Sequence, residues 1–392
     1  MKSPHPSTPW NLLLSLSLPA CLILTALISL VLPQKSFSPD ENRYLQKRPA
    51  FTWKTMLNGS FASTYDTYLS DQFPLREHWI AVKTDSDRLS GSRDTGGVYF
   101  GKDDYLIEKF DTEDIEGPQL DYNLDALADA VKRMEQKLGA DHVRVMLVPG
   151  ASQIMTDKLP ALAAPYDQSR VTQMLAERLE GEQLIVPVEA ALRKQQKAPL
   201  YYRTDHHWTT AGACIGYEAW AGSVGITPWE PDRFEQRTVS NDFLGTLYSK
   251  VQTGGRADSI ICYFPKEPAE YQVEYDENGI KTEGLYTYEA LKTRDQYAFF
   301  LDGNHGLARV TGGTESGEAE RAGRRLMVIK DSYAHSIAPF LVNHFEETLF
   351  VDLRYFNADP EQFAEENGVT DLLILYRIPG FAVEKTVSKL RR

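Results

Sequence analysis

Cysteine is scarce in this chain, and positive charge is outweighed by negative charge. Three cysteines in 392 residues are too few for a disulfide scaffold, and their spacing matches no metal-binding motif. A single disulfide between Cys214 and Cys262 is an alternative, although their sequence context does not indicate one. The net charge of −13 argues against a nucleic-acid partner, because phosphates would be repelled. A neutral or acetylated glycan is not excluded as a substrate.

One long hydrophobic run stands near the start of the chain. Residues 12–32 carry no charge and are followed by Pro33. A helix of that length spans about 30 Å, the thickness of the hydrocarbon layer. A cleaved signal peptide is the alternative, but it has a shorter apolar core and a small-residue cleavage site. We therefore predict an N-terminal transmembrane anchor.

The orientation of this anchor is predicted from the size of the flanking parts. Only Lys2 precedes the run, whereas several basic residues follow it, so charge alone favours the opposite orientation. A short N-terminal tail before a large C-terminal domain is nevertheless typical of signal anchors. We expect a single-pass protein of the cell membrane whose catalytic domain is extracytoplasmic.

The rest of the chain alternates between strand and helix patterns. Residues 1–33 are interpreted as tail and anchor, 34–100 as a membrane-proximal segment, and 101–392 as the main domain. Strands are predicted at residues 143–148, 184–188, 326–329, 348–353 and 371–376, with helices between them. This alternation predicts an α/β fold with a doubly wound parallel sheet. Residues 241–325 break the rhythm and are interpreted as a β-rich insertion, with a loop at 312–323.

Ser332 stands at a predicted strand–turn–helix junction. Four apolar residues precede Lys330, Asp331 and Ser332, and a helical pattern follows. Such a serine lies at the carboxyl edge of a parallel sheet, where ligand sites form. The adjacent helix N-terminus favours the oxyanion of an acyl-transfer reaction. An ordinary helix-capping serine is the simpler alternative.

Asp205, His206 and His207 are the densest group of proton-handling side chains. A nucleophilic serine needs a base, and the base needs a carboxylate to orient it. Asp205 and His207 can supply both from one loop, with His206 pointing away. Two alternatives remain: histidines that only pack against Trp208, or a metal site. Because no further ligand is evident, we predict neither a metal nor a cofactor.

A resemblance brings Ser332 and His207 together across the sequence. The segment Tyr-Arg-Thr-Asp-His-His-Trp-Thr at residues 202–209 is similar to the signature of the DHHW protein family. Further matching motifs lie at residues 37–43, 71–76, 241–246, 330–333 and 351–355. That family resembles the SGNH-hydrolase-like proteins of alginate O-acetylation, in which an Asp-x-His-Trp motif precedes a serine on a later strand.

The resemblance implies an SGNH-hydrolase-like domain with Ser332 as nucleophile, His207 as base and Asp205 as its orienting carboxylate. It implies an extracytoplasmic enzyme that transfers acetyl esters onto a cell-envelope or exopolysaccharide glycan, or hydrolyses them. A membrane O-acyltransferase is the expected partner and acetyl donor. A non-catalytic glycan-binding or assembly protein is the alternative. The second histidine, His206, departs from the alginate pattern and competes for the role of base.

Three further residues are predicted near the substrate. Arg203 precedes the Asp205 motif, Tyr333 follows Ser332, and Arg354 follows a predicted strand. Each also has an ordinary structural interpretation: a surface ion pair for Arg203, core packing for Tyr333, and a pair with Asp352 for Arg354.

Overall fold

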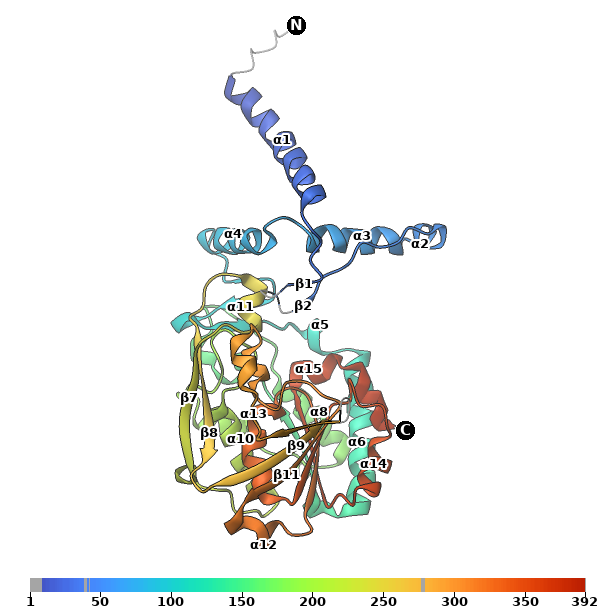
Figure 1. Cartoon of the computed structure of the whole chain (residues 1–392), viewed down its shortest axis with the longest axis vertical. Helices are drawn as coiled ribbons and strands as arrows, with labels where there is room; N and C mark the ends of the chain where they lie inside the picture. Colours follow the sequence, from blue (N-terminus) through green and yellow to red (C-terminus); the bar gives the residue numbers. More distant parts are fainter. Residues whose placement is uncertain (1–8, 39–40, 42, 276–278, 392) are drawn as a thin grey trace. The chain divides into compact units, whose positions relative to one another are not determined.

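The computed structural model describes residues 9–38, 41, 43–275 and 279–391 (Figure 1). Two compact units are present, Met1–Leu89 and Ser90–Arg392.

The first unit is mainly helical. Its elements are α1 (Pro9–Val31), β1 (Phe37–Ser38), β2 (Arg43–Tyr44), α2 (Trp53–Leu57), α3 (Ser60–Asp71) and α4 (Arg76–Leu89). Arg43 Nη2 lies 2.6 Å from Asp71 Oδ1, and Arg76 Nε lies 2.7 Å from Glu41 Oε1. These ion pairs connect two of the motifs that carry the family resemblance, at residues 37–43 and 71–76.

The predicted transmembrane anchor is not confirmed. Helix α1 covers the apolar run, but no helix in the described part of the chain is both long and apolar enough to cross a membrane. Hydroxyl side chains interrupt the apolar surface of α1: Thr25 and Ser29 donate hydrogen bonds of 2.8 Å to the carbonyls of Cys21 and Thr25.

A seven-stranded mixed sheet forms the centre of the second unit. In spatial order its strands are β10 (Ile280–Glu283), β9 (Ala269–Tyr275), β11 (Leu307–Thr314), β13 (Glu347–Val351), β12 (Arg325–Lys330), β14 (Asp371–Arg377) and β6 (Val143–Val148). The last four run parallel, with Val328 opposite Phe350 and Leu373. The first three join antiparallel.

The predicted doubly wound parallel sheet is therefore right for the half formed by β13, β12, β14 and β6. The β-rich segment 241–325 does not stay apart from the sheet, because β9, β10 and β11 extend it. In β9, Tyr271, Val273 and Tyr275 are buried while Gln272 between them is exposed. That alternation is typical of an antiparallel strand with one covered face.

Apolar side chains cover both faces of the parallel strands. In β12, Leu326 and Val328 join one hydrophobic core and Met327 and Ile329 join another. Helices α10 (Thr210–Ser223) and α13 (Ala334–Leu341) pack in the first core, and α6 (Pro118–Leu138) and α8 (Ser169–Leu179) in the second, on opposite sides of the sheet (Figure 1). The period-two burial explains why the strands read as continuous apolar runs.

Smaller elements complete the second unit. Two accessory sheets are formed by β3 (Asp94–Thr95), β4 (Val98–Phe100) and β5 (Leu106–Glu108), and by β7 (Phe234–Phe243) and β8 (Asp258–Pro265). The short helices are α5 (Thr112–Ile115), α7 (Ala151–Ile154), α9 (Val188–Lys194), α11 (Thr246–Val251), α12 (Glu318–Arg321), α14 (Pro360–Glu366) and α15 (Ile378–Val383). Cys214 and Cys262 are both free thiols, so the bridge left open by the sequence does not form.

Two local predictions are wrong. Residues 184–188 make one bridge, between Ile185 and Val145, instead of a strand. Pro187 has no N–H to continue the ladder, and α9 begins directly after it. The loop predicted at 312–323 instead contains the end of β11 and helix α12.

Candidate active site

The turn after β12 holds Ser332 between the sheet and α13. The carboxylate of Asp331 accepts hydrogen bonds of 2.9 Å from the backbone N–H groups of Tyr333 and Arg377. These bonds tie the turn to the end of the neighbouring strand β14. Burial raises the pKa of Asp331, against the opposing effect of those two N–H donors. The half-buried Ser332 side chain is thus presented from a fixed backbone.

The Asp205 motif lies on a tight loop closed by a bridge between Tyr201 and Trp208. Asp205 Oδ1 accepts from the backbone N–H of His207 at 2.9 Å and lies 2.5 Å from His207 Nδ1. Trp208 Nε1 donates to the carbonyl of Tyr333 at 3.0 Å, which joins this loop to the Ser332 turn. Thr209 caps α10, because its side chain accepts from the backbone N–H of Gly212.

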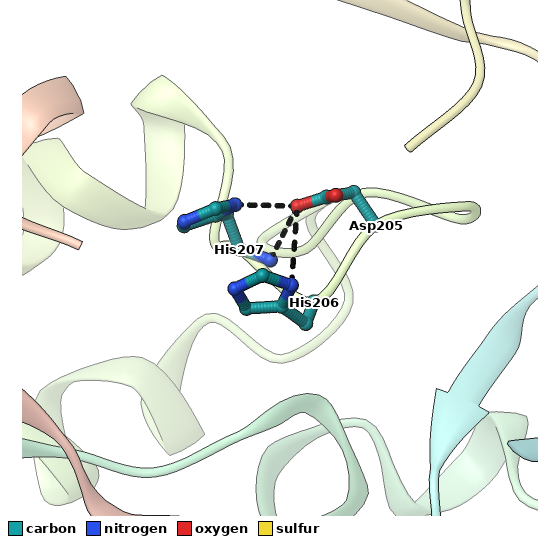
Figure 2. A group of neighbouring side chains, drawn as sticks. All are labelled: Asp205, His206 and His207. Atoms are coloured by element: carbon teal, nitrogen blue, oxygen red, sulfur yellow. Dashed lines mark hydrogen bonds and ion pairs between the residues drawn. The ribbon is translucent and has the colours of Figure 1, made fainter. Parts of the chain in front are cut away.

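The structure brings Asp205, His207 and Ser332 into one line of contacts. His207 Nε2 lies 2.7 Å from Ser332 Oγ, although 125 residues separate them in the chain. Figure 2 shows His207 with its other ring nitrogen directed at Asp205. A carboxylate, an imidazole and a hydroxyl in this order have the geometry of an acyl-transfer triad.

The second oxygen of Asp205 is held by Thr246 at the start of α11. Thr246 donates from its backbone N–H at 2.7 Å and from its hydroxyl at 3.0 Å to Oδ2. Gly245 makes this approach feasible, since a Cβ there would lie 2.2 Å from Asp205 Cβ. Burial by itself raises the pKa of Asp205, but the facing His207 and His206 and these hydrogen bonds hold it well below its usual range.

Asp205, His206 and His207 also have the composition of a metal site. One ligand atom from each lies within 4.8 Å of the others. Figure 2 shows both imidazoles directed at the same carboxylate. Both carboxylate oxygens already accept from N–H or O–H donors, and Nδ1 of each histidine already has a protein partner. A metal would have to displace these bonds, so the arrangement favours the proton-transfer interpretation.

Tyr333 is the only one of the three predicted substrate residues that directly contacts the histidines of the motif. Its ring lies 5.3 Å from that of His207, and its hydroxyl donates to the carbonyl of His206. Tyr333 is fully buried, and its contacts link the Ser332 turn to the Asp205 loop.

Arg203 and Arg354 make contacts of their own. Arg203 lies over the ring of Tyr105 and 3.7 Å from Asp258, and lines a cavity of about 340 Å³. The Arg354 side chain donates two hydrogen bonds to Asp352, at 2.9 and 2.6 Å, and one to Asn304. The pairing of Arg354 with Asp352 is the structural alternative recognised in the sequence.

Tyr297 is a neighbour of the triad that sequence reasoning missed. It belongs to a short 3-10 helix, Gln296–Phe299, within the insertion. Its ring stacks on His207 with centroids 3.8 Å apart and planes 12° apart. Its hydroxyl donates to the carbonyl of Ser332 at 3.2 Å. No pattern in the sequence distinguishes this tyrosine from its aromatic neighbours, so only the tertiary structure reveals it.

A second group of polar residues surrounds Lys330, the last residue of β12. Lys330 Nζ is 2.7 Å from His335 Nε2 and 3.3 Å from Asp352 Oδ2, and all three residues are buried. Burial lowers the pKa of Lys330, and burial together with Lys330 lowers the pKa of His335. The ion pair of Arg377 and Glu108 is half-buried, with Arg377 6.0 Å from the centre of the Tyr333 ring.

Comparison with known proteins identifies the relatives of this arrangement. Residues 98–288 match the family described as "SGNH hydrolase-like domain, acetyltransferase AlgX". This range contains Asp205 and His207 and ends before Ser332.

Two named relatives are probable alginate O-acetylases AlgJ. The protein of Pseudomonas syringae is 26% identical over 195 residues, covering 47% of this chain and 49% of the relative. That of Pseudomonas fluorescens is 26% identical over 230 residues, covering 56% and 57%. The chain thus spans about half the length of the curated relatives it matches.

Solved structures confirm the fold class. A DHHW family protein from Eubacterium siraeum matches with a TM-score of 0.61 at 22% identity, covering 76% of this chain and 96% of that one. PatB1 of Bacillus cereus matches with a TM-score of 0.58 at 18% identity, covering 73% and 97%. The predicted resemblance to the DHHW family and to the SGNH-hydrolase-like alginate O-acetylation proteins is therefore confirmed, and the fold is SGNH-like α/β.

Proposed function

We propose that this chain is an SGNH-like enzyme that transfers acetyl esters onto a glycan, or hydrolyses them, with Ser332, His207 and Asp205 as its triad. The observation that carries the proposal is the contact of His207 Nε2 with Ser332 Oγ at 2.7 Å while Nδ1 faces Asp205 at 2.5 Å. The ionised Asp205 holds the proton of His207 on Nδ1, which leaves Nε2 free to take the serine proton.

The reaction proceeds in two steps, acylation of Ser332 and transfer of the acetyl group to the acceptor. Ser332 Oγ attacks the acetyl carbonyl carbon as its proton passes to His207 Nε2; the ester bond to the donor breaks, and that proton goes to the leaving oxygen. An acceptor hydroxyl or water then gives its proton to Nε2 and attacks the acetyl group, and Ser332 recovers a proton from His207. Ser332 lies next to the N-terminal end of α13, whose partial positive charge favours the oxyanion formed in each step.

A polysaccharide is the substrate that the relatives support, since the AlgJ proteins are named probable alginate O-acetylases. We place the reaction outside the cytoplasm, with a membrane O-acyltransferase as the partner that supplies acetyl groups. Deleting the gene in its own host tests this placement: the surface polysaccharide should lose acetate while its chain length is kept. Unchanged acetate would contradict it.

The enzymatic assignment is tested on the full chain with p-nitrophenyl acetate. We expect a burst of p-nitrophenol and a peptide containing Ser332 that carries one acetyl group in mass spectra. Ser332→Ala should lose both signals. Ser259→Ala is the control, because the Ser259 side chain is exposed and donates to Asn241 at 2.9 Å. Equal turnover in Ser332→Ala and the native chain would overturn the assignment and favour a non-catalytic glycan-binding protein.

A further inference from the structure

His206 is the residue of the Asp-His-His-Trp motif that the triad leaves without a role. Its Nδ1 lies 2.6 Å from Thr246 Oγ1, which lies 3.0 Å from Asp205 Oδ2. A hydroxyl has one proton, and an ionised carboxylate can only accept. Thr246 therefore donates to Asp205, and its oxygen accepts from Nδ1–H of His206. This fixes the tautomer of His206 with its lone pair on Nε2.

The surroundings of His206 keep that lone pair available. Burial, together with the charge that His207 can carry, lowers the pKa of His206 to about 3. The charges of Arg377 and Glu108 act on the same ring with opposite signs. The side chain is nevertheless 19% exposed, and among the described residues no hydrogen bond reaches its Nε2. His206 is thus a neutral acceptor open to a ligand.

The direction of Nε2 is set by the stacking of the two imidazoles. Their centroids are 4.0 Å apart and their planes are tilted by 34°. Figure 2 shows each ring with one nitrogen on the side of Asp205 and the other on the opposite side. Because His207 Nε2 contacts Ser332 Oγ at 2.7 Å, the lone pair of His206 emerges on the same side as the nucleophile. Two nitrogen acceptors therefore stand side by side there.

We propose that His206 is a substrate-binding residue whose Nε2 accepts a hydrogen bond from the hydroxyl next to the one being acetylated, so that the preferred acceptor is a vicinal diol of a sugar. This inference rests on the proposed function and refines its second step. One hydroxyl of the diol gives its proton to His207 Nε2, and its oxygen takes the acetyl group from Ser332. The neighbouring hydroxyl donates to His206 and keeps its proton throughout.

The preference follows from the cost of an unpaired acceptor. An acceptor with no hydroxyl on the neighbouring carbon leaves His206 Nε2 without a donor. A site built to bond a substrate hydroxyl discriminates strongly against an analogue that lacks it. A water molecule can donate to Nε2 of both His206 and His207. The contact with His206 therefore also influences how often water, in place of a sugar, takes the acetyl group.

The test uses the full chain, p-nitrophenyl acetate as acetyl donor, and two acceptors: a methyl hexopyranoside and its 3-deoxy counterpart, which has no two hydroxyls on neighbouring carbons. We expect the native chain to acetylate the diol-containing sugar about tenfold faster. His206→Phe keeps a ring of similar shape without nitrogen. In that variant the ratio of the two acetylation rates should fall to about one, and this ratio does not depend on how fast the acetyl-enzyme forms.

A matched control and a second variant keep the result interpretable. His142→Phe removes an imidazole whose Nδ1 also faces a carboxylate, Asp371 at 3.0 Å, immediately before β6 at the amino end of the strands; it should keep the full preference. His206→Gln tests the site if the phenylalanine variant does not fold, and its side-chain oxygen should restore part of the preference.

Three outcomes overturn the proposal. The first is an undiminished diol preference in His206→Phe. The second is loss of the burst in a folded His206 variant, which would place His206 in the acylation step. The third is a native chain that shows a burst but no preference between the acceptors. Absence of the burst in the native chain would instead contradict the proposed function.

Discussion

Two clusters of polar side chains near the carboxyl edge of the sheet each contain a carboxylate and an imidazole. Their hydrogen-bond chains end on different groups. The Asp205 cluster consists of Asp205, His207 and Ser332; the Asp352 cluster consists of Asp352, Lys330 and His335. In the first, the carboxylate contacts the imidazole and the imidazole contacts a hydroxyl. In the second, the carboxylate contacts an ammonium group, which contacts the imidazole.

The difference lies in where each chain of contacts ends. The Asp205 cluster ends on the half-buried Ser332, next to a helix N-terminus. The Asp352 cluster ends on His335, whose Nδ1 is buried and has no partner among the described residues. A carboxylate and an imidazole become a proton-transfer device only where the last group can reach a substrate. The Asp352 cluster instead fixes the strand that carries Ser332, since Lys330 belongs to β12.

Replacing the imidazole of each cluster should give the largest contrast. His207→Ala removes the proposed base and should lower kcat by about 10⁵-fold or more. His335→Ala should lower the melting temperature and leave kcat of the folded protein within about tenfold. Turnover of p-nitrophenyl acetate and thermal unfolding, measured on the same samples, check both. Equal loss of kcat in two folded variants would remove the distinction between the clusters.

Asp205→Asn is expected to have the next largest effect. The amide cannot hold the proton of His207 on Nδ1, so kcat should fall by about 10⁴-fold with circular dichroism unchanged. Because folding lowers the pKa of Asp205, its contribution to the unfolding free energy is complete above about pH 4 and is lost as the pH falls. Denaturant titrations should therefore show a flatter acid dependence in Asp205→Asn, and a parallel dependence would argue against an ionised Asp205.

Tyr297→Leu should lower kcat by about 30-fold, because the stacked ring keeps His207 aligned with Ser332. Tyr297→Phe keeps the stack and should lose only about threefold. Tyr286→Leu is the matched control: Tyr286 stacks on Phe299 and donates to a backbone carbonyl at 2.9 Å. A kcat loss shared by both leucine variants would mean that the insertion acts only through stability.

Thr246→Val should lower kcat by about tenfold, since Asp205 loses one of its hydrogen bonds but keeps the backbone N–H of residue 246. Thr246→Ser restores a hydroxyl at the same position and should recover most of the rate. If serine gave no recovery, the loss would come from packing and not from the hydrogen bond.

Lys330→Met should have the smallest effect on turnover and a clear effect on stability. Removing one partner of a buried ion pair should lower the unfolding free energy by about 3 kcal/mol, while kcat stays within about threefold. Chemical denaturation beside steady-state assays measures both. A loss of kcat at unchanged stability would make the Asp352 cluster part of the reaction.

The candidate site could be predicted in part because its residues come in two short motifs. Asp205 and His207 are separated by one residue, so the tight loop is a local property, and Ser332 follows an apolar strand pattern. Tyr297 and Thr246 could not be found in this way. Tyr297 reaches His207 through the folding of the insertion, and Thr246 reaches Asp205 because Gly245 permits the close approach.

The parallel half of the fold was predictable for a similar reason. Strands β6, β12, β13 and β14 are buried on both faces and appear as continuous apolar runs. The antiparallel half was assigned to a separate insertion, because alternating burial in β9 does not reveal which strand it joins. Strand pairing over long sequence separations depends on register and on neighbours, which no local pattern encodes.

The sequence by itself determined the chemical types of the candidate site and the elements that carry them: a carboxylate and an imidazole on one loop, and a serine at a strand–helix turn. These follow from hydrophobic periodicity and from short-range geometry. Only the tertiary structure decided that His207 and Ser332 meet, that His206 bonds Thr246, and that Lys330 and His335 bond each other. Such contacts depend on packing between segments far apart in the chain, where a shift of a few ångströms decides which partner each group meets.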